Sequence, residues 1–360
     1  MPKASGPSIV QVGLGNFGQR HLNAWKRLEM LGRLWIAERD ERRRGEAQAA
    51  GIPADRIVSD AAQVLDRVDI VDIVTPSEQH MGPARAALAA GKDVFIEKPM
   101  TMTSADAREL AETVERTGRI LQVGYYYRFH PASQQLKALL DAGRLGGIRY
   151  ITGDFRGFKR ARNDVGVTHT DGIHFLDLFN WLLGAFPQDV YAVCRDHFGR
   201  GLEDFSVVLL TYPGGTVGKV ESGYIQPGRW PDKVVAGAKT TKELTVVGDR
   251  ATVEIDFEAE TCTLTEARHE SVNGVWAPQL GAPQTLPVES CDPVALVARE
   301  LQAFLDAVKT RQPAQAGPIA SGVRLAELME GLYESARRGQ PVRLPGQGER
   351  DAEPASVKAR

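Results

Sequence analysis

The tripeptide Glu97-Lys98-Pro99 is the first candidate for chemistry in this sequence. It follows the apolar run Val94-Phe95-Ile96, which has the character of a buried strand. A lysine at the end of such a strand directs its ammonium into the crevice beyond the sheet. Partial burial there lowers the pKa of the amine toward the range that suits proton transfer. Taken alone, the tripeptide fits an ordinary surface lysine equally well.

A second candidate is the segment Thr168-His169-Thr170-Asp171-Gly172-Ile173-His174, which precedes an apolar helical run. A histidine near a carboxylate can take or give the proton of an alcohol. We therefore predict that Lys98, His174 and Asp171 are the catalytic residues. The alternative is that Thr170 or Asp171 only caps the helix, with His174 in its first turn.

Metal and nucleophile chemistry are not indicated. The pattern His-x-Asp-x-x-His from His169 to His174 is not a familiar zinc spacing, and no cysteine lies near it. No Gly-x-Ser-x-Gly elbow is present, which argues against a serine hydrolase. The cysteines Cys194, Cys262 and Cys291 are far apart and are predicted to be reduced. We therefore expect no bound metal.

The start of the chain predicts a site for a phosphate-bearing ligand. An apolar strand at residues 9–12 leads into Gly13-Leu14-Gly15-Asn16-Phe17-Gly18, and a helical run follows at residues 19–30. A Gly-x-Gly-x-x-Gly turn between strand and helix is typical of a dinucleotide-binding unit. Gly13 permits the tight turn, Gly15 admits a pyrophosphate, and Gly18 allows close helix packing. The anion would lie against free N–H groups of this turn, where Asn16 and Phe17 are also predicted contacts.

The end of the second expected strand indicates which dinucleotide binds. Residues 34–38 end in Glu38, twenty residues after Gly18. A carboxylate at this place accepts hydrogen bonds from the adenosine ribose hydroxyls, which favours NAD. Arg39 follows directly and could pair with a 2′-phosphate, so NADP is the alternative.

The first third of the chain alternates strands with helices, which is typical of a doubly wound parallel sheet. Strands are expected at residues 9–12, 34–38, 57–58, 70–74, 93–96 and 120–124, and helices at residues 19–30, 39–50, 60–65, 78–90 and 103–117. Ligands bind beyond the carboxyl ends of such strands. Further cofactor contacts are therefore predicted at Thr75, Pro76, His80, Glu97 and Lys98.

The pattern changes after residue 126, where strands alternate polar and apolar residues as in an antiparallel sheet. Strands are expected at residues 150–158, 190–196, 204–212, 216–224, 244–247 and 251–257, and helices at residues 131–142, 174–183, 293–308 and 319–338. The predicted fold class is α/β: an N-terminal Rossmann domain at residues 1–126, with a doubly wound parallel sheet, and a C-terminal α+β domain at residues 127–344 with an open, mainly antiparallel sheet. The polar residues 345–360 are predicted to be a disordered tail.

Composition excludes several classes of protein. The 360 residues are 42% hydrophobic and 25% charged, with a formal net charge of −2. Nothing in this balance attracts nucleic acid or a membrane surface. No apolar run has membrane-spanning length, and residues 1–6 lack a signal-peptide core. A cytoplasmic protein is therefore expected.

Five blocks in a fixed order give a joint pattern that resembles the glucose-fructose oxidoreductase / inositol dehydrogenase / MocA family. The resemblance extends over residues 8–344, and its most specific element is Ala-Gly-Lys-x-Val-x-x-Glu-Lys-Pro. The blocks are residues 12–21, 75–76, 89–99, 123–131 and 174–177.

The resemblance implies NAD(P)-dependent oxidation or reduction of a secondary alcohol on a sugar, cyclitol or nucleotide-sugar. It also implies a second domain whose open sheet often mediates oligomers, so a homodimer or homotetramer is predicted. The family lysine corresponds to Lys98 and the family histidine to His174. This chain departs from the pattern at Thr170, where many members carry aspartate, and at Tyr126, where asparagine is common.

We therefore predict an NAD-preferring dehydrogenase in which His174 or Lys98 takes the hydroxyl proton and Lys98 stabilises the developing alkoxide. Two alternatives share the fold: an NAD-dependent, redox-neutral glycosidase and a non-catalytic, sugar-responsive regulator. The predicted substrate-binding residues are Lys98, Tyr126, Arg128, His130, Lys159, Arg162, His169, Thr170, Asp171 and His174.

Overall fold

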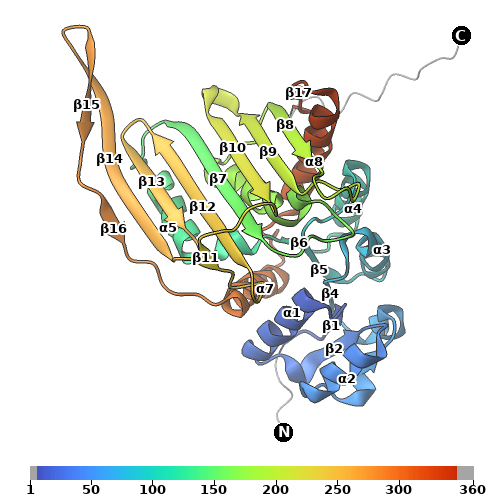
Figure 1. Cartoon of the computed structure of the whole chain (residues 1–360). Helices are drawn as coiled ribbons and strands as arrows, with labels where there is room; N and C mark the ends of the chain where they lie inside the picture. The colour runs from blue at the N-terminus through green and yellow to red at the C-terminus, as the bar shows by residue number, and fades with distance from the viewer. Residues whose placement is uncertain (1–5, 347–360) are drawn as a thin grey trace, which may run out of the picture.

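The computed structural model describes residues 6–346, which form two packed parts (Figure 1). A parallel sheet with its helices occupies the N-terminal part, and a much larger sheet forms the second part. Residues 1–5 and 347–360 lie outside the described residues. Most of the predicted disordered tail at residues 345–360, and most of the segment at residues 1–6 that lacks a signal-peptide core, therefore also lies outside them.

The first sheet has six parallel strands, as the sequence predicted. They are β1 (Ile9–Val12), β2 (Leu34–Ala37), β3 (Ile57–Val58), β4 (Ile70–Ile73), β5 (Asp93–Glu97) and β6 (Leu121–Gly124). Their order is β3-β2-β1-β4-β5-β6, so the order of successive strands reverses between β1 and β4. Strands β4 and β5 are completely buried, which explains their runs of β-branched residues.

Four helices connect these strands: α1 (Asn16–Arg27), α2 (Glu41–Ala49), α3 (Met81–Ala89) and α4 (Ser104–Thr117). The helix expected at residues 60–65 is instead the 3₁₀-helix η3 (Ala61–Arg67). Short 3₁₀ turns also precede β2, β3 and α3; these are η1 (Leu31–Arg33), η2 (Ala54–Arg56) and η4 (Ser77–Gln79).

The second sheet has eleven strands. They are β7 (Ile148–Phe158), β8 (Asp189–Arg195), β9 (Phe205–Thr211), β10 (Val217–Gly223), β11 (Trp230–Pro231), β12 (Lys239–Gly248), β13 (Ala251–Asp256), β14 (Thr261–Val272), β15 (Val275–Leu280), β16 (Gln284–Leu286) and β17 (Val342–Arg343). The main order is β15-β14-β13-β12-β7-β10-β9-β8-β17, with β11 beside β12 and β16 beside β14. Every pair is antiparallel except β7 with β10, so the prediction of a mainly antiparallel sheet is confirmed.

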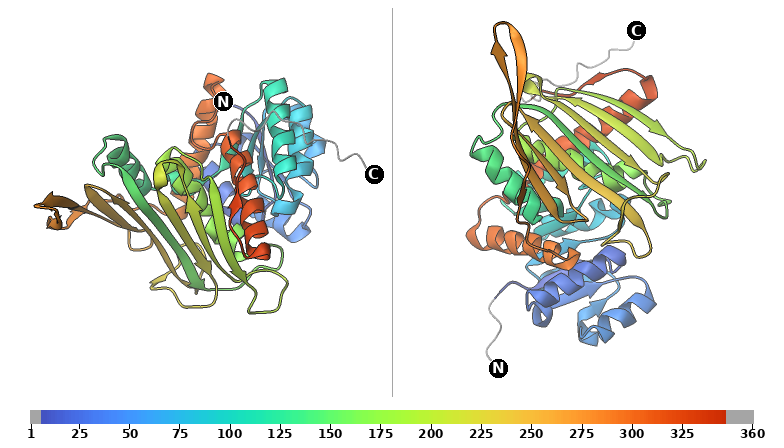
Figure 2. Two further views of the ribbon diagram at one scale, coloured as in Figure 1. Left: turned by 90° about the horizontal axis from the view of Figure 1, so that it is seen from above. Right: turned by 60° about the vertical axis from the view of Figure 1, so that its left-hand side comes forward.

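The hairpin of β14 and β15 was missed by the sequence prediction, which placed no strand between residues 258 and 292. Its outer half extends beyond the rest of the sheet (Figure 2) and is exposed on both faces. Such a strand has no buried side and therefore no apolar alternation to detect. The turn Asn273-Gly274, with φ of +53° and +79°, was the available signal, because this pair favours tight hairpin turns.

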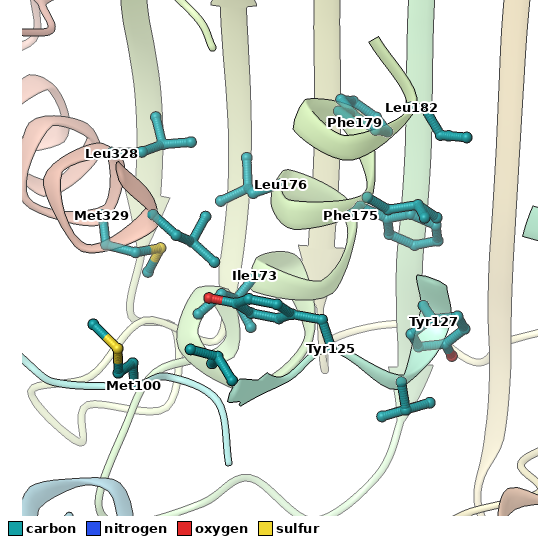
Figure 3. Packing of buried hydrophobic residues seen from close by; sticks show 14 of the residues in the cluster. Met100, Tyr125, Tyr127, Ile173, Phe175, Leu176, Phe179, Leu182, Leu328 and Met329 are labelled. Carbon is teal, nitrogen blue, oxygen red and sulfur yellow. The ribbon is translucent and has the colours of Figure 1, made fainter. Parts of the chain in front are cut away.

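Helices cover one face of the large sheet (Figure 2), and α6 (Ile173–Leu183) lies at the centre of this layer. Phe175 and Phe179 lie on one side of α6, while α8 (Ile319–Arg338), with Leu328 and Met329, lies on the other (Figure 3). This apolar packing fixes the start of α6, which carries His174.

Helix α6 begins earlier than the sequence predicted. The π-helix η6 (Thr168–Gly172) runs directly into it, and no side chain caps either segment. The alternative in which Thr170 or Asp171 caps the helix is therefore wrong, because both residues already lie inside a helical turn.

The last long helices return to the first sheet. Helix α7 (Pro293–Thr310) packs beside α1, and Phe304 contacts Phe95 of β5 with ring centroids 5.6 Å apart. Helix α8 contacts both α4 and β8. Short elements complete the chain: η5 (Tyr126–Phe129) and α5 (Pro131–Asp141) lie between β6 and β7, and η7 (Pro213–Gly215) lies between β9 and β10. Within residues 6–346, no helix is long and apolar enough to cross a membrane.

Candidate active site

The glycine turn after β1 has the geometry that a dinucleotide requires. Gly13 has φ of +99°, and a Cβ there would lie 2.8 Å from the carbonyl oxygen of Val74. A Cβ at Gly18 would lie 2.5 Å from the carbonyl oxygen of Gly13, so α1 can approach only because this residue is glycine. At Gly15 the space is open, since the nearest atom is Arg43 Nη1 at 4.0 Å.

Unpaired polar groups surround this turn. No side chain caps the start of α1, and its first turn holds no acidic residue, so the N–H groups of this turn are available to an anion. The hydroxyl of Thr75, just beyond β4, is buried without a hydrogen-bond partner among the described residues. Both observations fit a bound dinucleotide, with its pyrophosphate at α1.

Glu38 lies at the adjacent strand end, where the ribose would lie. Its Oε2 accepts the N–H of Leu14 at 2.7 Å and its Oε1 accepts the N–H of Asp40 at 2.9 Å. These bonds hold the carboxylate against the glycine turn and leave lone pairs for hydroxyl groups. Arg39 is exposed, whereas Arg43 Nη1 lies 3.8 Å from Glu38 Oε2. Arg43, which sequence reasoning missed, is therefore the arginine that faces the Glu38 carboxylate, whereas Arg44 Nη1 donates to the carbonyl oxygens of Glu38 and Arg39 at 3.0 Å and 2.7 Å.

His80 joins the two turns beyond β4 and β5. Its Nε2 lies 3.0 Å from the carbonyl oxygen of Thr75, and its Nδ1 lies 2.9 Å from that of Pro99. Burial lowers the pKa of His80, and the neutral imidazole has a single N–H, which it donates to one of these two carbonyl oxygens. Pro76 begins the turn between them, and the Lys98–Pro99 peptide bond is cis. His80 thus positions the backbone around Lys98.

Lys98 reaches from the end of β5 to the second part of the molecule. Its Nζ donates a hydrogen bond to the carbonyl oxygen of Thr170 at 2.7 Å. Burial lowers the pKa of Lys98 to about 8, although Glu97 and Asp171 oppose the shift. The hydroxyl of Thr170 instead donates to the carbonyl oxygen of Gly166 at 2.9 Å. Thr170 therefore contributes its backbone, not its side chain, to this contact.

His174 is surrounded by aromatic rings. The ring centroids of Tyr126 and Tyr127 lie 4.9 Å and 5.1 Å from that of His174, and Phe155 lies at 6.1 Å. Within the described residues no group hydrogen-bonds to its imidazole. Burial, together with the nearby lysines, lowers the pKa of His174 well below its usual value. The neutral ring therefore has both nitrogens available to a ligand.

Tyr126 connects this histidine to the dinucleotide turn. Its ring centroid lies 6.1 Å from that of Phe17, in the first turn of α1, while Asn16 beside it is exposed. The tyrosine therefore occupies the space between the expected cofactor and His174.

Asp171 is paired with Lys159 and not with His174. Lys159 Nζ lies 3.0 Å from Asp171 Oδ1 and 2.9 Å from Oδ2, and both side chains are at least 92% buried. The lysine also lies above the ring of Phe155, at 4.8 Å from its centroid. The structure thus brings Asp171 into the site as the partner of a lysine.

Two of the expected substrate-binding residues have their polar groups committed elsewhere. Arg128 forms a buried, bidentate ion pair with Asp177, with Nε to Oδ2 at 2.8 Å and Nη2 to Oδ1 at 2.5 Å. His130 caps α5, because its Nδ1 accepts the N–H of Ala132 at 3.2 Å. His130 and Tyr126 also line one small cavity with Lys242, Phe257 and Glu258.

His169 and Arg162 lie at the edge of the site. The Nδ1 of His169 lies 2.8 Å from the hydroxyl of Tyr333, which in turn donates to Glu203 Oε1 at 2.7 Å. Arg162 is paired with Asp164, with Nε to Oδ1 at 2.8 Å. The charge of Arg162 lowers the pKa of Lys98, and burial together with the charge of Lys98 lowers the pKa of His169 to about 4. Neither residue bonds directly to Lys98 among the described contacts.

Sequence reasoning missed two buried charge clusters. In the first, Lys242 on β12 lies 3.1 Å from Asp232 Oδ2 and bonds to Glu258, close to the ring of Phe155. In the second, His21 of α1 lies between Asp72 and Glu97. Asp72 could have been noticed as an acid in an otherwise apolar central strand, and Lys242 as a charged residue on the same face of β12 as the buried Leu244 and Val246.

The fold and this site define a class: oxidoreductases with an NAD-binding Rossmann domain and a second, sheet-rich domain. A family model described as "Oxidoreductase family, NAD-binding Rossmann fold" matches residues 8–125, and the GFO/IDH/MocA C-terminal domain matches residues 133–254. The chain belongs to the Gfo/Idh/MocA family, so the resemblance found in the sequence is confirmed. NAD is accordingly confirmed as the cofactor type of the N-terminal domain.

Several characterised proteins are similar to this chain. D-apiose dehydrogenase of Paraburkholderia graminis is 31% identical over 59% of this chain and 59% of its own length. The NAD(+)-dependent scyllo-inositol 2-dehydrogenase of Bacillus subtilis is 28% identical over 60% of this chain and 67% of its own. The matched region thus spans less than two thirds of the first relative.

The solved structure of levoglucosan dehydrogenase in complex with NADH superposes with a TM-score of 0.80, at 19% identity, over 95% of this chain and 100% of the other. This likeness confirms the predicted fold class.

Proposed function

We propose that this protein is an NAD-preferring dehydrogenase that interconverts a secondary alcohol and a ketone on a neutral sugar or cyclitol. The carrying observation is the hydrogen bond from Lys98 to the Thr170 carbonyl. It joins the strand end beside the dinucleotide turn to the helical turn that leads into His174. A substrate carbinol between the two groups would contact a proton carrier and a neutral imidazole at once.

Lys98 is the proton carrier in this proposal. An amine whose pKa is about 8 exchanges protons readily near physiological pH. During oxidation the neutral amine accepts the hydroxyl proton, and the ammonium then stabilises the carbonyl oxygen. During reduction the ammonium returns the proton. When bound, the oxidised cofactor NAD(+) would accept the hydride in oxidation, and NADH would donate it in reduction.

His174 orients the hydroxyl in this scheme. Its pKa lies well below the usual value, so the ring stays neutral through the physiological range and can donate one hydrogen bond and accept another. Tyr126, Tyr127 and Phe155 hold the ring and exclude water from it.

The charges in the site support a neutral substrate. Lys159 is neutralised by Asp171, and Lys242 by Asp232 and Glu258, so neither lysine offers uncompensated positive charge to a phosphate or carboxylate. Of these three lysines, only Lys98 has no direct carboxylate partner in the part of the chain that the structure describes. An acidic or phosphorylated sugar would need to break one of these buried pairs, which is costly.

The named relatives agree with a dehydrogenase acting on a sugar or cyclitol. Neither the redox-neutral glycosidase nor the regulator gains support from them.

Three unpaired cysteines fit a cytoplasmic protein.

The face of the large sheet without helices exposes apolar residues such as Leu209 and Val217, which supports a homo-oligomer formed through that face. Light scattering after size exclusion tests the oligomer.

A substrate panel tests the function. Neutral sugars and cyclitols, aldonic acids, sugar phosphates and nucleotide-sugars are each incubated with NAD, and absorbance of NADH is followed. We expect turnover with a neutral polyol and at least about tenfold lower kcat/KM for its anionic analogues. Exclusive turnover of anionic substrates would contradict the neutral assignment, and failure across the panel, with NAD bound, would contradict the dehydrogenase.

A further inference from the structure

A fully buried imidazole lies between two carboxylates directly behind the catalytic strand end. His21 Nδ1 lies 3.0 Å from Asp72 Oδ2, and His21 Nε2 lies 3.2 Å from Glu97 Oε1. The histidine comes from α1, and the acids from the central strands β4 and β5. Trp25 Nε1 also donates to Asp72, at 2.7 Å.

The geometry requires a charged ring. A neutral imidazole has a single N–H and could donate to only one of the two acids, leaving a lone pair against the other. Burial opposes the charge, but Asp72 and Glu97 outweigh it and raise the pKa of His21 to about 10. The group therefore consists of one imidazolium and two carboxylates.

Among the described residues, the other elements packed here add no competing cation; His80, which also interacts with the charge of Glu97, has a pKa lowered by burial. Phe17 and Phe95 flank the ring, with centroids at 5.5 Å and 5.6 Å. From α7, Glu300 presents two carboxyl oxygens without hydrogen-bond partners in the described chain. Burial and the proximity of Glu97 raise the pKa of Glu300 well above its usual range, so it is protonated and neutral. Within residues 6–346, His21 is thus the cation that compensates Glu97 from behind.

Glu97 connects His21 to Lys98, because its carboxylate contacts both residues. Its Oε2 accepts the backbone N–H of Lys98 at 3.2 Å, and a Cβ at Gly124 would lie 2.5 Å from Oε1. The carboxylate is therefore fixed in position. The other charges that act on the Lys98 ammonium are Asp171, Arg162 and Lys159, from the second part of the molecule.

We propose that His21 is a positioning residue for Lys98: as an imidazolium it holds the Glu97 carboxylate in place behind the lysine, and so determines the fraction of Lys98 that is a free amine. This inference rests on the proposed function only where it treats Lys98 as the proton carrier of the reaction. Without the imidazolium, two buried carboxylates would share no cation, and Glu97 would lose the partner that holds its Oε1 in place. Lys98 would then lose an anion that raises its pKa, and it would release its proton at lower pH.

The test titrates Lys98 without any substrate. The full-length protein is labelled with trace acetic anhydride from pH 6 to 11, and acetylation of Lys98 is quantified by peptide mass spectrometry. We expect the midpoint to fall by about one pH unit in His21→Gln and in His21→Asn, as for loss of a close opposite charge. Glu97→Gln should produce the same displacement, and adding His21→Gln to it should produce no more.

Trp25→Phe is the matched control, because it removes a buried hydrogen bond to Asp72 but keeps the imidazolium; its midpoint should equal that of the parent protein. Midpoints unchanged in both His21 variants, with lower melting temperatures alone, would show a purely structural role and overturn the proposal. Because labelling needs no turnover, a failed substrate panel leaves this test intact.

Discussion

The ammonium of Lys98 lies 2.7 Å from the carbonyl oxygen of Thr170, a residue 72 positions later in the chain. This contact joins the end of β5 to the π-helical turn before His174. An α-helical turn at that place would present different carbonyl groups, because the π-helix adds a residue to the turn. The juxtaposition of the amine and the imidazole therefore depends on this local irregularity.

Replacing the lysine should abolish most of the activity. Lys98→Met keeps the length of the side chain but removes its charge and proton. We expect kcat to fall by about two to four orders of magnitude, the range typical of a positioned acid–base group. NAD affinity, measured by calorimetry, should be retained because the glycine turn and Glu38 are untouched. Near-normal turnover would assign Lys98 a structural role.

The pH dependence follows from the lowered pKa of Lys98. Oxidation requires the free amine, so kcat/KM for the alcohol should rise with pH and level off above about 8. Reduction requires the ammonium, so kcat/KM for the ketone should fall through the same range. A profile with the opposite slopes would instead make the ammonium the active form in oxidation. Initial rates in buffers of constant ionic strength check both slopes.

Glu38 should make the protein bind NAD more tightly than NADP. Its carboxylate would repel a 2′-phosphate, and a cost on the order of 2 kcal/mol corresponds to about thirtyfold weaker binding of NADP than of NAD. Glu38→Gln should narrow that difference, and Arg43→Ala in the same background should widen it again if Arg43 contacts the phosphate. The matched control is Arg39→Ala, since Arg39 is exposed. Calorimetry that finds equal or tighter NADP binding by the parent protein would contradict this prediction.

Asp171→Asn should affect substrate binding and the titration of Lys98. The variant leaves Lys159, which is 92% buried, without its counter-charge, and removes an anion that raises the pKa of Lys98. We expect a higher KM and a pH profile displaced to lower pH. The double variant with Lys159→Met should recover stability, because no unpaired charge remains. An unchanged KM and profile would limit Asp171 to a structural pair.

The charge on His21 predicts a pH-dependent stability. Its pKa is about 10 in the folded protein and lies near 6.5 when unfolded, so the folded state alone holds this proton between the two values. The stabilisation is complete below pH 6.5 and is lost as the pH rises toward 10. Relative to His21→Gln, the free energy of unfolding should fall by at most about 1.4 kcal/mol per pH unit in this window. Denaturant titrations at several pH values measure the difference, and parallel curves would refute the imidazolium.

The sequence by itself determined the order of strands and helices in the first domain. The β-branched runs and the glycine turn are local patterns, and their spacing specifies both the parallel sheet and the role of each glycine. Glu38 and Lys98 could be placed at strand ends for the same reason, because strand termini in a parallel sheet share one edge. The hairpin of β14 and β15 escaped prediction because its outer half has no buried face.

Tertiary structure alone decided which polar groups are paired. The sequence offered Asp171 as a partner of His174, but the chain brings Lys159 from the end of β7 to it instead. Arg128 and His130 looked equally suited to bind substrate, yet a buried carboxylate and a helix start occupy them. Asp72 and Glu97 lie 51 and 76 residues after His21, and only the packing of α1 against β4 and β5 brings the three together. A buried charge must find a counter-charge through space, and spacing along the chain does not specify which one it meets.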